Sequence, residues 1–318
     1  MPVGIGARGW SGGRARATAK DRPAADSLRV KTSVRRYDLL EASQSLRILH
    51  HVCSRDSQRN QVITMFERWR SRQSTATAKA CVPDGWCLYV VGDIHGEAAL
   101  LRQLLASIEH HVSQQRGVAA ALAYVGDYID RGPASAEVLD IVCVKPGWAA
   151  KVISLRGNHE EMLQRFLIDP AFGNDWRHYG GLETLASFGV DVRQVQLGRD
   201  LSQARDELLE RIPQRHRQFL NNLGSSAAMG DYFLCHAGVR PGVRLADQRD
   251  EDLLWIREPF LTSTADFGKI IIHGHSPVEQ PEMTPNRINV DTGAYLTGRL
   301  TCAVLQGSAV EFLSTTRQ

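Results

Sequence analysis

Short apolar runs alternate with amphipathic stretches along the last three-quarters of the chain. Continuous apolar runs of four to six residues are typical of buried strands, whereas apolar residues three and four positions apart are typical of a helix. Leu100, Leu101, Leu104 and Ile108 have the helical spacing and predict a helix over residues 97–112. The predicted strands cover residues 87–91, 120–125, 152–155, 232–235, 270–272, 287–290, 300–305 and 309–313.

The order of these elements predicts the class of fold. Helical patterns over residues 97–112 and 134–144 join the first three strands, which favours parallel pairing. Residues 160–223 are mostly helical in pattern, and we expect the strands after them to form a second, more antiparallel set. The sequence therefore predicts an α/β (mixed α+β) fold in which two packed sheets are flanked by helices.

The N-terminal quarter has a different composition. Residues 1–36 are rich in Gly, Ala, Arg and Ser, so we expect them to be disordered. The first 79 residues carry 16 Lys and Arg against 6 Asp and Glu, although the whole chain has a net charge of only +3. We predict a basic, largely disordered extension over residues 1–80 and a compact domain over residues 81–318. Two alternatives for the extension are an organellar transit peptide and a translation start at Met65.

Composition and cysteine usage narrow the class of protein. Hydrophobic residues make up 43% of the chain and charged residues 23%, which suits a packed soluble core. No apolar stretch approaches the roughly 20 residues that cross a bilayer, so we expect no transmembrane segment. The six cysteines form no C-x-x-C pair, which favours reduced thiols in a cytoplasmic protein.

Five short polar motifs follow predicted strands. In open α/β sheets, sites form beyond the carboxyl ends of the strands, so we expect these motifs to meet. They are Gly-Asp-Ile-His-Gly at 92–96, Gly-Asp-Tyr-Ile-Asp-Arg-Gly at 126–132, Gly-Asn-His-Glu at 157–160, His-Ala-Gly at 236–238 and His-Gly-His at 273–275.

The motifs contain the donors that divalent cations prefer, namely carboxylate, amide and imidazole groups. A carboxylate has two oxygens and can bridge two ions, and we assign that role to Asp127. Six ligands from five strand ends predict two metal ions about 3.5–4 Å apart, the usual spacing of a hydrolytic pair. The candidate ligands are Asp93, His95, Asp127, Asn158, His236 and His275.

Two such ions would activate a bridging water, and the hydroxide would attack phosphorus directly. Arg131 and Arg257 are expected to hold the phosphoryl oxygens, because a guanidinium offers paired donors, and Asn158 to contact phosphate as well as metal. His159 is the candidate general acid, with Asp130 orienting its ring. These residues together predict a phosphoester hydrolase.

The motif set resembles the PPP family of phosphoprotein phosphatases, within the calcineurin-like metallophosphoesterase superfamily. The resemblance covers residues 85–315 and is strongest to compact bacterial members and the lambda phage phosphatase. It implies a four-layer αββα sandwich and a dinuclear centre of the Mn²⁺ type, with Fe or Zn as alternatives. It also implies that one metal takes Asp93, His95 and Asp127, and that the other takes Asp127, Asn158, His236 and His275.

The resemblance further implies a serine/threonine protein phosphatase whose partners are phosphoproteins or phosphopeptides. One alternative is a symmetrical diadenosine tetraphosphate hydrolase, a group that tends to lack the second Asp before Arg-Gly and to read Gly-Asn-His-Asp. Asp130, Glu160 and the stretch 179–185 favour the protein phosphatase. An alternative of another class is a binding module that uses the basic extension. The extension lacks interleaved aromatic residues, so we expect no nucleic-acid partner, and its own partner is left open.

Overall fold

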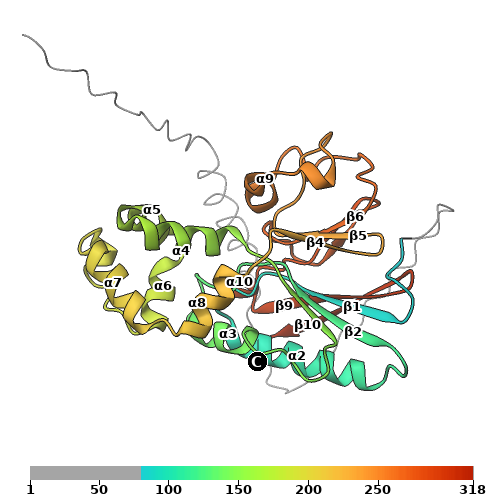
Figure 1. Cartoon of the computed structure of the whole chain (residues 1–318), viewed down its shortest axis with the longest axis horizontal. Helices are drawn as coiled ribbons and strands as arrows, with labels where there is room; N and C mark the ends of the chain where they lie inside the picture. The colour runs from blue at the N-terminus through green and yellow to red at the C-terminus, as the bar shows by residue number, and fades with distance from the viewer. Residues whose placement is uncertain (1–79, 318) are drawn as a thin grey trace, which may run out of the picture. The chain divides into compact units, whose positions relative to one another are not determined.

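The computed structural model describes residues 80–317, and its elements carry the labels of Figure 1. The predictions for residues 1–79, including a start at Met65, lie outside the described residues. Between residues 80 and 317, no helix is both long enough and apolar enough to cross a membrane.

The first sheet has the strand order β10-β9-β1-β2-β3. The predicted parallel pairing of the first three strands is confirmed, since β1 pairs with β2 and β2 with β3 in parallel. On its other side β1 pairs with β9 in antiparallel register, with Val91 opposite Cys302. The strands are β1 (Trp86–Val91), β2 (Ala119–Tyr124), β3 (Lys151–Ser154), β9 (Arg299–Gln306) and β10 (Ala309–Thr316).

The second sheet has the order β4-β5-β6-β8-β7. Its three central strands are parallel, and only the edge strands β4 and β7 are antiparallel to their neighbours. The late strands pair with one another in antiparallel register more often than the first three strands do, as expected, but the last two of them join the first sheet. The strands are β4 (Ser226–Met229), β5 (Tyr232–Cys235), β6 (Ile270–His273), β7 (Glu282–Met283) and β8 (Arg287–Asn289).

Three apolar clusters show that the described chain is layered. Alternate residues of β1 enter different clusters, as the pleat of a strand requires. Tyr89 packs toward the helices beside the first sheet, whereas Leu88 and Val90 pack between the two sheets with Leu234 and Ile272. A third cluster, which includes Phe233 and Leu253, covers the outer face of the second sheet. The predicted α/β architecture with two sheets and flanking helices is confirmed.

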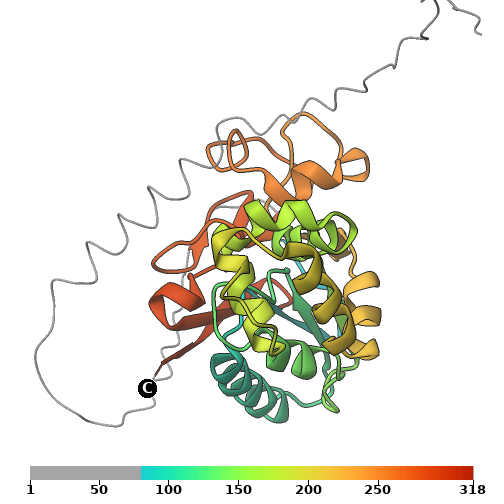
Figure 2. The same cartoon turned by 90° about the vertical axis from the view of Figure 1, so that its left-hand side faces the viewer.

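The helices lie mainly beside the first sheet and at one end of it (Figure 1). α2 contacts β9 and β10, and α3 contacts α2. The predicted helical region after β3 is present as α4 to α8, which Figure 2 turns toward the viewer. The helices are α2 (Ala98–Ser113), α3 (Ser135–Val142), α4 (Asn158–Ile168), α5 (Gly173–Trp176), α6 (Gly181–Ser187), α7 (Leu201–Arg211), α8 (Gln214–Asn221), α9 (Asp250–Trp255) and α10 (Ala294–Thr297).

Candidate metal centre

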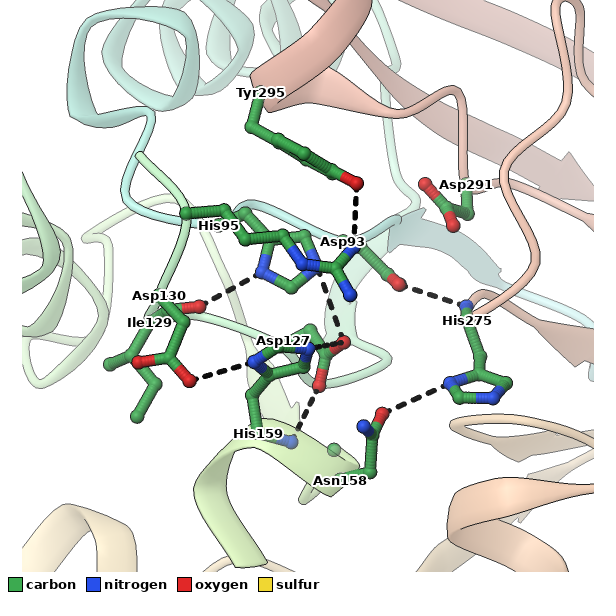
Figure 3. Close-up of polar contacts among 12 residues, drawn as sticks. Asp93, His95, Asp127, Ile129, Asp130, Asn158, His159, His275, Asp291 and Tyr295 are labelled. Carbon is green, nitrogen blue, oxygen red and sulfur yellow. Dashed lines mark hydrogen bonds and ion pairs between the residues drawn. The ribbon is translucent and has the colours of Figure 1, made fainter. Parts of the chain in front are cut away.

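The six candidate ligands converge where strands of both sheets end. Four follow the parallel strands of the first sheet, namely Asp93 and His95 after β1, Asp127 after β2 and Asn158 after β3. His236 and His275 follow β5 and β6 of the second sheet. All six side chains are buried. Figure 3 shows Asp93, Asp127 and Asn158 from the first sheet beside His275 from the second.

Asp127 lies between two groups of histidines. Its Oδ2 is 3.3 Å from Nε2 of His95, and its Oδ1 is 3.4 Å from Nε2 of His236. Two sets of ligand atoms therefore share this carboxylate, with all atoms of a set within 4.8 Å of one another: His95, Asp127 and His159, and Asp127, His236 and His275. One carboxylate that faces both ways is the geometry that a bridging ligand needs.

Backbone carbonyls fix the orientation of two of the imidazole rings. Nδ1 of His95 lies 2.9 Å from the carbonyl oxygen of Ile129, and Nδ1 of His236 lies 3.1 Å from that of Val125. A ring that donates from Nδ1 leaves the Nε2 lone pair directed toward the centre, which is the tautomer that a metal ligand requires.

Asn158 connects His236 with His275. Its Oδ1 lies 2.8 Å from Nε2 of His236 and 3.0 Å from Nδ1 of His275. Asn158 is the first residue of α4, directly after β3, so the start of a helix directs this amide oxygen into the centre.

Asp93 is held against a glycine. Its Oδ2 accepts the backbone N–H of His275 at 2.8 Å, whereas its buried Oδ1 has no hydrogen-bond partner in residues 80–317. A Cβ atom at Gly274 would overlap this Oδ1, and one at Gly157 would overlap Oδ1 of Asp127. Both close approaches require glycine, because any other residue would push a candidate ligand away.

The backbone is conformationally unusual in this region. Among residues 80–317, six non-glycine residues have a positive φ, and five of them are candidate site residues. Such conformations cost of order 1–3 kcal/mol each and persist only where the surroundings impose them. The five are His95, Asp127, Asp130, Arg131 and His275.

Burial disfavours charge on these groups. It raises the pKa of Asp93 and of Asp127 well above the ordinary value, and neighbouring carboxylates add to the effect. Burial also lowers the pKa of His95 and of His275 well below the ordinary value. The histidines are thus neutral and can offer a nitrogen lone pair, and the clustered carboxylates include one buried oxygen, Oδ1 of Asp93, without a hydrogen-bond partner in residues 80–317. This donor set fits divalent metal ions.

His159 and Asp130 form a buried pair beside the ligands. Nδ1 of His159 lies 2.7 Å from Oδ2 of Asp130, whereas the buried Nε2 lies 3.9 Å from Oδ2 of Asp127 and has no hydrogen-bond partner in the described chain. Trp176 and Thr184 donate to the two oxygens of Asp130 at 2.8 and 2.5 Å. These donors favour the ionised form of Asp130, although burial raises its pKa overall. Asp130 is therefore fixed in place and orients the His159 ring through Nδ1, the nitrogen opposite Nε2.

The two candidate phosphate-binding arginines lie on different loops, and both are half-buried. Arg131 follows Asp130 and donates from Nη1 to the hydroxyl of Tyr295 at 2.8 Å. Arg257 follows α9, and its Nη2 donates to the carbonyl oxygen of His275 at 3.3 Å.

Glu160 has a role that its sequence position did not reveal. Its buried carboxylate accepts backbone N–H groups of Asp127, Tyr128 and Gly157 at 2.8–2.9 Å. The side chain thus ties the loop after β2 to the loop after β3. Its place in a motif directly after His159 was the only available signal.

Asp291 was also missed. It is buried, its Oδ1 accepts the backbone N–H of Gly293 at 2.8 Å, and burial raises its pKa to about 6. The negative charge of Asp291 disfavours a second negative charge on Asp93 and so contributes to the raised pKa of Asp93. An Asp followed by Thr-Gly after the predicted strand 287–290 was a usable signal, because it repeats the pattern of the other motifs.

Comparisons with protein families and with known proteins both find enzymes that cleave phosphate esters or anhydrides. A family model described as calcineurin-like phosphoesterase matches residues 88–306. An asymmetrical bis(5'-nucleosyl)-tetraphosphatase PrpE of Anoxybacillus flavithermus is 28% identical over 231 residues, which are 67% of this chain and 87% of that protein. A protein of the same name from Halalkalibacterium halodurans is 26% identical over 245 residues, which are 71% and 92% of the two chains.

A solved structure with a similar fold is a metallophosphoesterase from Sphaerobacter thermophilus. It is 14% identical, has a TM-score of 0.45, and covers 74% of this chain and 90% of its own.

Proposed function

The chain belongs to the calcineurin-like phosphoesterase family, and from this premise we propose that it is a serine/threonine protein phosphatase. It is a metallophosphoesterase by family, and its proposed partners are phosphoproteins or phosphopeptides. The buried His159–Asp130 pair is the observation that supports this choice of substrate.

Members of this family use divalent metals, and the donor set around Asp127 fits two of them. Asp93, His95 and Asp127 would hold one ion, and Asp127 would hold the second with Asn158, His236 and His275. When bound, the ions, proposed to be Mn²⁺ with Fe or Zn as alternatives, would supply an activated water and neutralise phosphate charge.

The residues of the chain would perform the remaining steps. Arg131 and Arg257 approach the centre from two loops and would hold phosphoryl oxygens, with Asn158 as a further contact. In its protonated form His159 would donate the proton of Nε2, which has no hydrogen-bond partner in residues 80–317, to the leaving oxygen and return to the neutral ring. Asp130 would keep the ring in the orientation that this transfer requires.

The proton donor favours a monoester with a poor leaving group. A seryl or threonyl alkoxide is a strong base and leaves only when it is protonated. A phosphate released from an anhydride is stable as an anion and gains little from an acid. A pair as well fixed as His159 and Asp130 is therefore most useful for phosphoserine and phosphothreonine.

The names of the relatives favour a second candidate, hydrolysis of dinucleoside tetraphosphates. Proteins 26–28% identical to this chain are named asymmetrical tetraphosphatases. The alternative that the motifs suggested is symmetrical cleavage, whereas the relatives are named for asymmetrical cleavage.

A substrate panel on the full chain tests both candidates. Phosphoserine and phosphothreonine peptides and diadenosine tetraphosphate would be compared at equal concentration with Mn²⁺, Fe²⁺, Zn²⁺ or Mg²⁺. We expect phosphate release from the peptides with the higher kcat/KM, highest with Mn²⁺. A higher kcat/KM for diadenosine tetraphosphate, with ATP and AMP as products, would support the second candidate and overturn the first.

A further inference from the structure

Arg131 and Tyr295 form a close pair although 164 positions separate them in the sequence. Nη1 of Arg131 donates to the Tyr295 hydroxyl at 2.8 Å, and the guanidinium carbon lies 4.7 Å from the centre of the Tyr295 ring. Figure 3 shows this hydrogen bond as a dashed line from the Tyr295 hydroxyl. Arg131 is thus held by two kinds of contact with one side chain.

The same ring contacts a candidate metal ligand. The rings of Tyr295 and His95 pack in a T-shaped arrangement with 5.1 Å between the ring centroids. α10, which carries Tyr295, is a short helix between Gly293 and Gly298, and both glycines have a positive φ. This reversal of the chain before β9 places a half-buried tyrosine beside the centre.

We propose that Tyr295 is a positioning residue for Arg131 and thereby determines how tightly the site holds the phosphate of its substrate. The proposal rests on the proposed function only in assigning Arg131 to phosphate. An arginine side chain has many rotamers, so a site that fixes its guanidinium before binding loses less entropy when phosphate arrives. A guanidinium carries five N–H donors, so a hydrogen bond at Nη1 is compatible with paired donation to phosphate.

The test separates the hydroxyl from the ring. Tyr295→Phe keeps the ring against His95 and removes the acceptor for Arg131. Tyr232→Phe is the matched control, because its hydroxyl donates to the carbonyl oxygen of Ala80 at 3.2 Å, outside the candidate centre. Binding of inorganic phosphate to the Mn²⁺-loaded full chain would be measured by calorimetry, and turnover with p-nitrophenyl phosphate.

We expect Tyr295→Phe to weaken phosphate binding roughly 3–10-fold, the usual effect of one lost hydrogen bond. KM for p-nitrophenyl phosphate should rise by the same factor, with kcat within about twofold, and Tyr232→Phe should match the wild type. In an Arg131→Ala background, Tyr295→Phe should have no further effect, because the two residues act as one unit.

Two results with the variants would overturn the proposal. One is phosphate affinity in Tyr295→Phe equal to that of the wild type. The other is a loss that adds in full to that of Arg131→Ala, which would indicate a role independent of Arg131. Neither readout uses a phosphopeptide, so phosphate binding that depends on Tyr295 in a protein inactive on phosphopeptides would remove the proposed function and leave this proposal standing. Absence of phosphate binding by the metal-loaded wild type would remove this proposal.

Discussion

The surroundings of His159 fit the role of general acid that its sequence position predicted. It follows a candidate ligand, its Nδ1 is hydrogen-bonded to Asp130, and its buried Nε2 has no hydrogen-bond partner in the described chain. Trp176 and Thr184, which hold Asp130, lie 46 and 54 positions after it. The sequence could predict the pair because both residues lie in motifs, but no local pattern connects Trp176 with Asp130.

Replacement of His159 by Asn should affect substrates according to their leaving group. We expect kcat for a phosphothreonine peptide to fall at least about 100-fold, the usual contribution of a general acid. The loss with p-nitrophenyl phosphate should be at least about tenfold smaller, because nitrophenolate leaves without a proton. Metal content, measured by elemental analysis, should be unchanged.

A matched control for this variant exists elsewhere in the chain. His216 is also buried, and its Nε2 lies 2.6 Å from Oδ1 of Asp140. His216→Asn removes a comparable pair outside the candidate centre, so the ratio of the two rates should stay at the wild-type value. Equal losses on both substrates in His159→Asn would remove His159 from the role of general acid.

At the scale of elements, α6 supports the loop that carries Asp130 and Arg131. The backbone N–H of Arg131 donates to the carbonyl oxygen of Gly180 at 3.3 Å, just before α6 begins, and Thr184 on α6 contacts Asp130. Gly180 has φ of 98°, and a Cβ atom there would collide with the backbone nitrogen of Arg131.

Gly180→Ala should therefore displace this loop. We expect kcat/KM for p-nitrophenyl phosphate to fall at least about tenfold, because Arg131 and Asp130 move together. Gly242→Ala is the control, since Gly242 also has a positive φ but a Cβ atom there would meet nothing within 4 Å. Both variants carry the left-handed strain of about 1–2 kcal/mol, which denaturation would measure. Similar activity in the two variants would show that the contact with Arg131 does not matter.

Sequence patterns predicted the positions of helices and strands better than they predicted which strands pair. The helix predicted at 97–112 is α2, and the strand predicted at 232–235 is β5. β4 was missed because Ser226–Met229 contains small residues and no β-branched ones, so its pairing with β5 decides its conformation. The sheet to which β9 and β10 belong was also predicted wrongly, because the pairing of strands far apart in the sequence does not affect local periodicity. Tyr295 was missed because its partner Arg131 lies 164 positions away in the sequence.

At the scale of the whole molecule, the candidate centre connects the two sheets. Asp127 follows a strand of the first sheet, and His236 and His275 follow strands of the second. An ion held by these residues would stabilise the folded state over the unfolded chain, by about 4 kcal/mol at a metal concentration 1,000 times Kd.

Removal of metal should consequently lower the thermal stability. We expect EDTA to lower Tm by about 8–16 °C, from 2–4 °C per kcal/mol for a domain of this size. Calorimetry with and without added Mn²⁺ would measure the change. A Tm that does not respond to EDTA or Mn²⁺ would contradict a metal that bridges the sheets.

Asp127→Asn provides the control and adds a dependence on pH. Its Tm should not respond to Mn²⁺. In EDTA, the raised pKa of Asp127 means that its contribution to stability is present below the unfolded value of about 3.9 and is lost as pH rises through the folded value. The metal-free wild type should thus lose stability relative to Asp127→Asn as pH rises above about 4.

The pairing of β1 with β9 also sets the order in which the molecule can assemble. β1 is the central strand of its sheet, yet one of its two neighbours ends only at Gln306. A ribosome would therefore have added more than 200 residues after β1 before the strand that leads to Asp93 and His95 could acquire both partners. During synthesis one edge of β1 would stay unpaired until the hairpin of β9 and β10 had emerged. Metal would then bind late in folding, after β9 has paired with β1, rather than early.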